Sequence, residues 1–122
     1  MSKILIVDDD PGVRFMLKTV LTTYGDFKNI EEADNGRDAI IKYNSLKPDL
    51  VIMDLIMRGT DGLQALKHIL NIHPKAKIII LTAQGQALLL KRCIEAGAKD
   101  FIIKPFDNKK FIERVKKVLG AE

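Results

Sequence analysis

The sequence has little that is typical of a secreted, membrane or disulfide-rich protein. Only one of its 122 residues is cysteine, so no disulfide can form within the chain, and this suits a reducing cytoplasm. No apolar run approaches the roughly 20 residues that a membrane-spanning helix needs. After Lys3 come only four apolar residues, too few for a secretory leader. We therefore expect a cytoplasmic protein with no membrane segment.

Features of nucleotide-binding and nucleic-acid-binding proteins are also missing. The first apolar stretch is followed by Asp8-Asp9-Asp10-Pro11-Gly12 instead of a glycine-rich loop, and these carboxylates would repel a pyrophosphate. The net charge of +4 is spread out except near the C-terminus, and no nucleic-acid motif accompanies the basic residues there. We interpret this cluster as a solvated helix face or, as a second choice, a docking surface for an acidic protein. It consists of Lys109, Lys110, Arg114, Lys116 and Lys117.

Apolar stretches and amphipathic stretches alternate along the chain. The apolar stretches are continuous or rich in β-branched residues, as in strands that are buried on both faces. Between them, apolar residues recur at helical spacing, and Asp10-Pro11 and Gly25 are start and stop signals of the first helix. We expect strands at 3–7, 29–33, 50–54, 77–81 and 101–103, and helices at 11–25, 39–46, 63–70, 86–96 and 109–119, with a loop at 56–62.

Five successive strand–helix units predict an α/β fold with a parallel sheet. Right-handed crossovers then place helices on both faces of the sheet, in a doubly wound arrangement. The second strand is more polar than the others, which favours a place near the edge. A chain of this length suits a single domain, residues 1–122.

Polar residues stand at the carboxyl ends of four predicted strands. In a parallel sheet these ends lie at one edge, where open α/β sheets bind their ligands. Clustered carboxylates repel one another unless a cation is bound, and oxygen ligands without histidine or cysteine favour a hard ion such as Mg²⁺. With a lysine and a hydroxyl, they form a set suited to phosphoryl transfer, in which a carboxylate can act as nucleophile. The residues are Asp8, Asp9, Asp10, Asp54, Thr82 and Lys104.

The remaining ligand-type side chains have simpler interpretations. His68 and His73 have no partner at metal-ligand spacing, so we expect surface or helix-end residues. Cys93 falls within a predicted helix, where a small core hydrophobe is expected.

Together these motifs resemble the receiver domain of two-component response regulators, over essentially the whole chain. The resemblance is strongest to the stand-alone receivers of chemotaxis and of the sporulation phosphorelay. It implies a flavodoxin-like (βα)5 fold with strand order 2-1-3-4-5. The stretches that carry it are Ile6-Val7-Asp8-Asp9 with Arg14, Asp49 to Asp54, Asp61-Gly62, Leu81-Thr82-Ala83, Gly97 to Phe101 and Lys104-Pro105-Phe106.

The resemblance also implies roles for site residues. Asp54 would accept a phosphoryl group from a sensor histidine kinase or a histidine phosphotransfer protein. Asp8 and Asp9 would bind Mg²⁺ together with Asp54 and the backbone carbonyl of Ile56. Lys104 would pair with the phosphoryl group, and its peptide bond to the following proline would be cis.

Phosphorylation in this family is read out through a conformational switch. By resemblance, Thr82 would bond the phosphoryl oxygen and Phe101 would turn inward. This would alter the surface of the fourth helix, fifth strand and fifth helix for a downstream target protein. We expect a monomer, with dimerisation on phosphorylation as an alternative. The sequence departs from the family at Arg58, where a proline is usual, while Ile56 and Gln84 occupy positions that tune phosphoryl lifetime.

Two alternatives stay open at this point. Asp8 and Asp10 form an Asp-x-Asp motif after a buried strand, as in haloacid-dehalogenase-type phosphatases. This alternative leaves Asp54 unexplained, and the chain is too short to contain the cap domain of such phosphatases. The second alternative is that the chain is a receiver fragment of a longer transcriptional regulator. The end at Leu119 to Glu122 shows no linker, which favours the stand-alone form.

Overall fold

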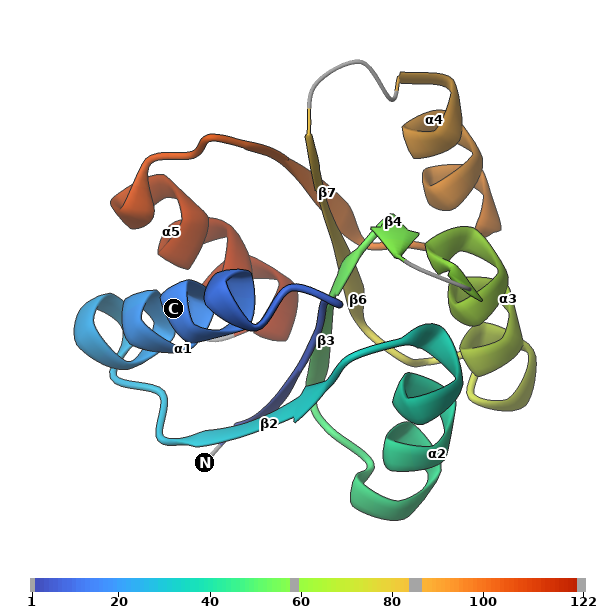
Figure 1. The fold of residues 1–122 in the computed structure, drawn as a ribbon, viewed down its shortest axis with the longest axis horizontal. Helices are drawn as coiled ribbons and strands as arrows, with labels where there is room; N and C mark the ends of the chain where they lie inside the picture. The colour runs from blue at the N-terminus through green and yellow to red at the C-terminus, as the bar shows by residue number, and fades with distance from the viewer. Residues whose placement is uncertain (1, 58–59, 84–86, 121–122) are drawn as a thin grey trace.

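The computed structural model describes residues 2–57, 60–83 and 87–120 (Figure 1). Within these residues strands and helices alternate, as the sequence predicts. None of the described helices is long and apolar enough to cross a membrane. The elements are β1 (Lys3–Val7), α1 (Pro11–Gly25), β2 (Asn29–Ala33), α2 (Gly36–Leu46), β3 (Leu50–Asp54), β4 (Ile56–Met57), β5 (Thr60–Asp61), α3 (Gly62–Ile72), β6 (Ile78–Ala83), α4 (Ala87–Ala96), β7 (Asp100–Lys104) and α5 (Asn108–Leu119).

The five long strands form one parallel sheet in the order β2-β1-β3-β6-β7. Counted by long strands alone, this is the predicted order 2-1-3-4-5, with the more polar β2 at an edge. Figure 1 shows α1 and α5 on one face of the sheet and α2, α3 and α4 on the other. The predicted doubly wound α/β fold is therefore confirmed.

Successive residues of each central strand enter opposite cores, because side chains in a strand alternate between its two faces. In β1, Ile4 and Ile6 pack with the residues that α1 and α5 contribute, whereas Leu5 and Val7 pack with those of α2, α3 and α4. All four are fully buried. This double coverage explains the unbroken apolar runs in the sequence and leaves the strand ends as the place for polar chemistry.

Helix ends follow local sequence signals in most places. Asp10 caps α1 by accepting a hydrogen bond from the Gly12 N–H at 2.8 Å, with Pro11 as the first helical residue. Asn35 caps α2 in the same way, from the Asp38 N–H at 2.7 Å. These caps place the first turns of both helices beside the carboxyl edge of the sheet.

The structure differs from the sequence prediction in several places. The second helix, α2, begins at Gly36 and not at residue 39, and β6 extends to Ala83 instead of ending at residue 81. At the end of α1 the left-handed residue is Asp26, with φ 57°, and not Gly25. A Cβ at Gly25 would lie 2.7 Å from the Phe27 ring, so a larger residue there would force that ring to move. The predicted loop at 56–62 contains a small antiparallel pair, β4 with β5. Arg58 and Gln84 lie outside the described residues, as does the predicted helix start at Gln86.

Candidate functional site

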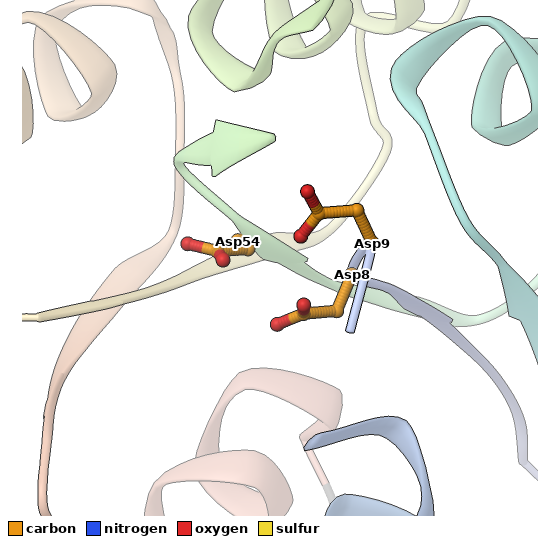
Figure 2. Close-up of side chains that lie close together, drawn as sticks. All are labelled: Asp8, Asp9 and Asp54. Carbon is orange, nitrogen blue, oxygen red and sulfur yellow. The ribbon is translucent and has the colours of Figure 1, made fainter. Parts of the chain in front are cut away.

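The carboxyl edge of the sheet brings most of the predicted site residues together. Asp8 and Asp9 follow β1, Asp54 ends β3, and Lys104 ends β7. Carboxylate oxygens of Asp8, Asp9 and Asp54, one from each, lie within 4.8 Å of one another (Figure 2). The Lys104 Nζ is 4.0 Å from Asp8 Oδ2 and 3.9 Å from Asp54 Oδ2. Residues separated by almost a hundred positions thus converge on one site.

Asp8 is held on several sides. Its N–H donates to the Ala33 carbonyl in β2 at 3.1 Å, and its Oδ1 accepts from the Asp10 N–H at 2.9 Å. Its own carbonyl accepts from Arg14 Nη1 at 2.6 Å. The other carboxylate oxygen, Oδ2, is buried and has no hydrogen-bond partner among the described residues. A buried oxygen without a donor is costly, which favours a cation at this point.

Asp54 is accessible to a reagent because its side chain is 13% exposed. The Ile56 N–H donates to its Oδ1 at 3.3 Å, so the chain just beyond the strand orients the carboxylate. Gly62 makes this tight turn possible. A Cβ at Gly62 would lie 2.6 Å from the backbone oxygens of both Asp54 and Leu55, closer than any side chain can approach.

The two central carboxyls share an unusual electrostatic environment. Burial raises the pKa of Asp8 from its usual 3.8 to about 6, and the neighbouring charge of Asp54 adds to the effect. Burial likewise raises the pKa of Asp54, while Lys104 acts in the opposite direction on both groups. One lysine therefore does not fully compensate the negative charge of the cluster.

These features fit a hard divalent cation. The cluster offers three carboxylates, and the buried Oδ2 of Asp8 is a ready ligand. Mg²⁺ is typically bound by one or two carboxylates with water and phosphate oxygens, and it does not need histidine or cysteine. The Ile56 N–H donates a hydrogen bond to Asp54. The role of the Ile56 carbonyl as a metal ligand stays a prediction.

Thr82 and Phe101 lie at different levels of the sheet. Thr82 is the fifth residue of β6, is 1% exposed, and pairs in register with Ile103, next to Lys104. Phe101 pairs with Ile80, three positions before Lys104, and packs against the core on the side of α2, α3 and α4. Phe101 is therefore not part of the acidic cluster, and the proposed switch roles of both residues stay predictions.

The sequence assigned no role to two residues that shape the site. Arg14 bonds the Asp8 carbonyl, and Gly62 permits the close turn behind Asp54. A signal for Arg14 exists, because it lies four residues after the cap at Asp10 and so faces back toward the start of the helix. For Gly62 the motif Asp61-Gly62 marked the position, but the reason lies in the backbone of a neighbouring turn.

The other ligand-type side chains stand apart from the cluster, as expected. His73 bonds Asn44 Oδ1 at 2.9 Å and its ring lies 4.8 Å from that of Tyr43, while His68 is exposed on α3. Cys93 is fully buried in the core. The Lys104–Pro105 peptide bond is cis, as the resemblance implied.

Comparison with known proteins decides the family. Residues 4–116 match the response regulator receiver domain. The chain belongs to the response regulator receiver family. This membership makes it a phosphoacceptor signalling protein rather than a classical enzyme, as predicted.

Relatives of this receiver domain include chemotaxis proteins of similar length. It is 47% identical over 117 residues to chemotaxis protein CheY of Thermotoga maritima, covering 96% of this chain and 97% of that protein. Identity to CheY of Bacillus subtilis is 45% over 118 residues, covering 97% and 98%. These similarities confirm the predicted likeness to chemotaxis receivers.

Solved structures share the same fold. A crystal structure of the CheX-CheY-BeF3-Mg²⁺ complex from Borrelia burgdorferi matches with TM-score 0.89 and 36% identity, covering 96% of this chain and 88% of that one. The receiver domain of NtrX from Brucella abortus matches with TM-score 0.90 and 28% identity, covering 98% and 100%.

Proposed function

We propose that this chain is a stand-alone receiver, a single domain over residues 1–122, that is phosphorylated on Asp54. The donor is a phosphohistidine of a sensor kinase or a histidine phosphotransfer protein in the cytoplasm. The observation that carries the proposal is the partly exposed Asp54 carboxylate beside Lys104 and the Asp8–Asp9 pair. In the transfer, the phosphorus–nitrogen bond of the donor breaks, a bond forms between phosphorus and an Asp54 oxygen, and the imidazole leaves.

Each side chain of the site has a separate task in this reaction. Asp8, Asp9 and Asp54, with the Ile56 carbonyl, would hold Mg²⁺, which neutralises charge on the transferring oxygens. Lys104 contributes a second positive charge close to the Asp54 oxygen. The family resemblance of the chain and the chelating geometry of the cluster support these roles.

Output through protein contacts is the second part of the proposal. Thr82 would bond the new phosphoryl group, and Phe101 would repack as Thr82 moves, shifting the balance between two conformations. The surface of α4, β7 and α5 would then recruit a target protein. Support comes from exposed apolar side chains on this surface, Leu88 and Ile94 on α4 and Ile103 on β7. The unmodified protein is proposed to be a monomer that can dimerise on phosphorylation.

The experiment that tests this function is labelling with acetyl phosphate in Mg²⁺. Asp54→Asn should abolish the acid-stable mass increase seen by intact mass spectrometry of the wild type, because the nucleophile is gone. Asp100→Asn, at the opposite edge of the sheet, is the matched control and should label normally. Continued labelling of Asp54→Asn would overturn the assignment, and label on Asp8 with turnover of small phosphate esters would indicate the phosphatase alternative.

A further inference from the structure

Arg14 connects the first helix to the acidic cluster. Its N–H bonds the Asp10 carbonyl at 3.1 Å within the first turn of α1. Its side chain is only 17% exposed and reaches back toward the sheet. There, Nη1 donates to the Asp8 carbonyl at 2.6 Å and Nε donates to Glu32 Oε1 at 3.0 Å. One guanidinium thus joins α1, the end of β1 and the neighbouring strand β2.

These contacts complete the fixation of Asp8. Its N–H is bound by β2, its carbonyl by Arg14, and its Oδ1 by the Asp10 N–H. Of these polar groups of Asp8, only Oδ2 has no hydrogen bond among the described residues, and it lies on the side of Lys104. The Asp8 carbonyl belongs to the peptide unit that carries the nitrogen of Asp9, so the bond from Arg14 also sets the direction in which the chain leaves toward Asp9.

We infer that Arg14, oriented by Glu32, is a positioning residue for the metal ligands Asp8 and Asp9. The inference rests on the proposed function and deepens it. Its side-chain hydrogen bonds go to the Asp8 carbonyl and to Glu32, and it acts by holding the peptide between the two aspartates. A lysine does not replace it, because an ammonium lacks the planar fork that binds a carbonyl and a carboxylate at once.

Lys18 provides a matched control for the charge of this ion pair. It approaches the same glutamate, with Nζ 3.5 Å from Glu32 Oε2, but its side chain is 50% exposed. No hydrogen bond between Lys18 and Asp8 occurs among the described residues. Removing Lys18 deletes a positive charge beside Glu32 and leaves the bond to the Asp8 carbonyl in place.

The test is the Mg²⁺ affinity of the unphosphorylated protein, measured by titration calorimetry. Arg14→Ala and Arg14→Lys should each weaken Mg²⁺ binding by about tenfold to a hundredfold, the usual effect of losing a group that orients a metal ligand. Lys18→Ala should stay within about twofold of the wild type, because an exposed ion pair contributes little. In variants that thermal unfolding shows to be folded, labelling by acetyl phosphate should fall at low Mg²⁺ and recover at saturating Mg²⁺.

Wild-type Mg²⁺ affinity in both Arg14 variants would overturn the inference and leave the phosphorylation of Asp54 untouched. Absence of Mg²⁺ binding in the wild type would overturn the proposed function itself. Thermal unfolding in EDTA shows whether each variant is folded. If Arg14→Ala is unstable, the Mg²⁺ affinity of Arg14→Lys decides the test, because lysine keeps the charge and most of the volume.

Discussion

Aspartates at the two edges of the sheet differ in their hydrogen-bond and charge partners. At the amino edge, Asp100 accepts two hydrogen bonds from Arg114, at 2.9 and 2.8 Å, and Asp49 accepts one from the Lys3 N–H at 2.7 Å. At the carboxyl edge, Asp8 and Asp54 share one lysine at about 4 Å, and a buried oxygen of Asp8 has no donor among the described residues.

This difference separates carboxylates that contribute to the fold from carboxylates that are available for chemistry. At the amino edge, the Arg114 guanidinium compensates the charge of Asp100, which leaves little affinity for a further cation. Among the described residues the Asp8 carboxylate has no cationic donor within hydrogen-bond distance, so its buried charge carries an unfavourable desolvation energy that a bound cation relieves. The carboxyl edge therefore lowers the stability of the metal-free protein and raises its affinity for Mg²⁺. Three substitutions test this contrast, in order from the largest expected effect to the smallest.

Gly62→Ala should destabilise the protein most. The new Cβ would overlap the backbone oxygens of Asp54 and Leu55 at 2.6 Å, which forces the acceptor strand end and the start of α3 apart. We expect a loss of about 3 kcal/mol in the free energy of unfolding, as for overpacked sites, measured by urea denaturation. Gly12→Ala is the control, since its Cβ would meet only the flexible Asp10 carboxylate, at 3.2 Å, and should change stability by less than about 1 kcal/mol. Equal losses in the two variants would show that the turn behind Asp54 is not tightly packed.

Asp8→Asn should stabilise the metal-free protein at neutral pH. Because the folded-state pKa of Asp8 is raised to about 6, the folded state binds the proton more tightly than the unfolded state does. The wild type therefore loses stability as the pH rises from about 4 to 6, and the penalty is complete above that range. The full shift corresponds to about 3 kcal/mol. Because the buried amide keeps part of the desolvation cost, we expect a gain of about 2 kcal/mol at pH 7 and little gain at pH 4.

Thermal unfolding in EDTA across this pH range measures the gain, and a second series with Mg²⁺ should show stabilisation of the wild type that Asp8→Asn lacks. If Asp8→Asn were less stable than the wild type at pH 7 without metal, the charge on Asp8 would already be compensated, and the contrast between the edges would fail.

Asp100→Asn should have the smallest effect and the opposite sign. It weakens the ion pair with Arg114, whose side chain is 46% exposed, so the loss should be below about 1 kcal/mol. Chemical denaturation at pH 7 measures it, with Mg²⁺ affinity expected to equal that of the wild type. A change in Mg²⁺ affinity would mean that the two edges are coupled through the sheet.

Much of the fold was predictable from local patterns. Apolar runs such as that of β3 marked strands covered on both faces, and Asp10-Pro11 marked the start of the first helix. The left-handed turn at Asp26 and the short strands β4 and β5 were not predicted, because they depend on packing and pairing between segments rather than on local propensity.

For the site, the sequence by itself determined which residue types gather at one edge, because a parallel arrangement carries every strand end to the same side. Asp8, Asp54 and Lys104 follow from that rule alone. Only the tertiary structure decided how they are held: the bond from Arg14 to the Asp8 carbonyl, the approach of Gly62 to the backbone of Asp54, and the buried oxygen of Asp8 without a donor. These depend on distances of a few ångströms between segments remote in sequence, which no periodicity encodes.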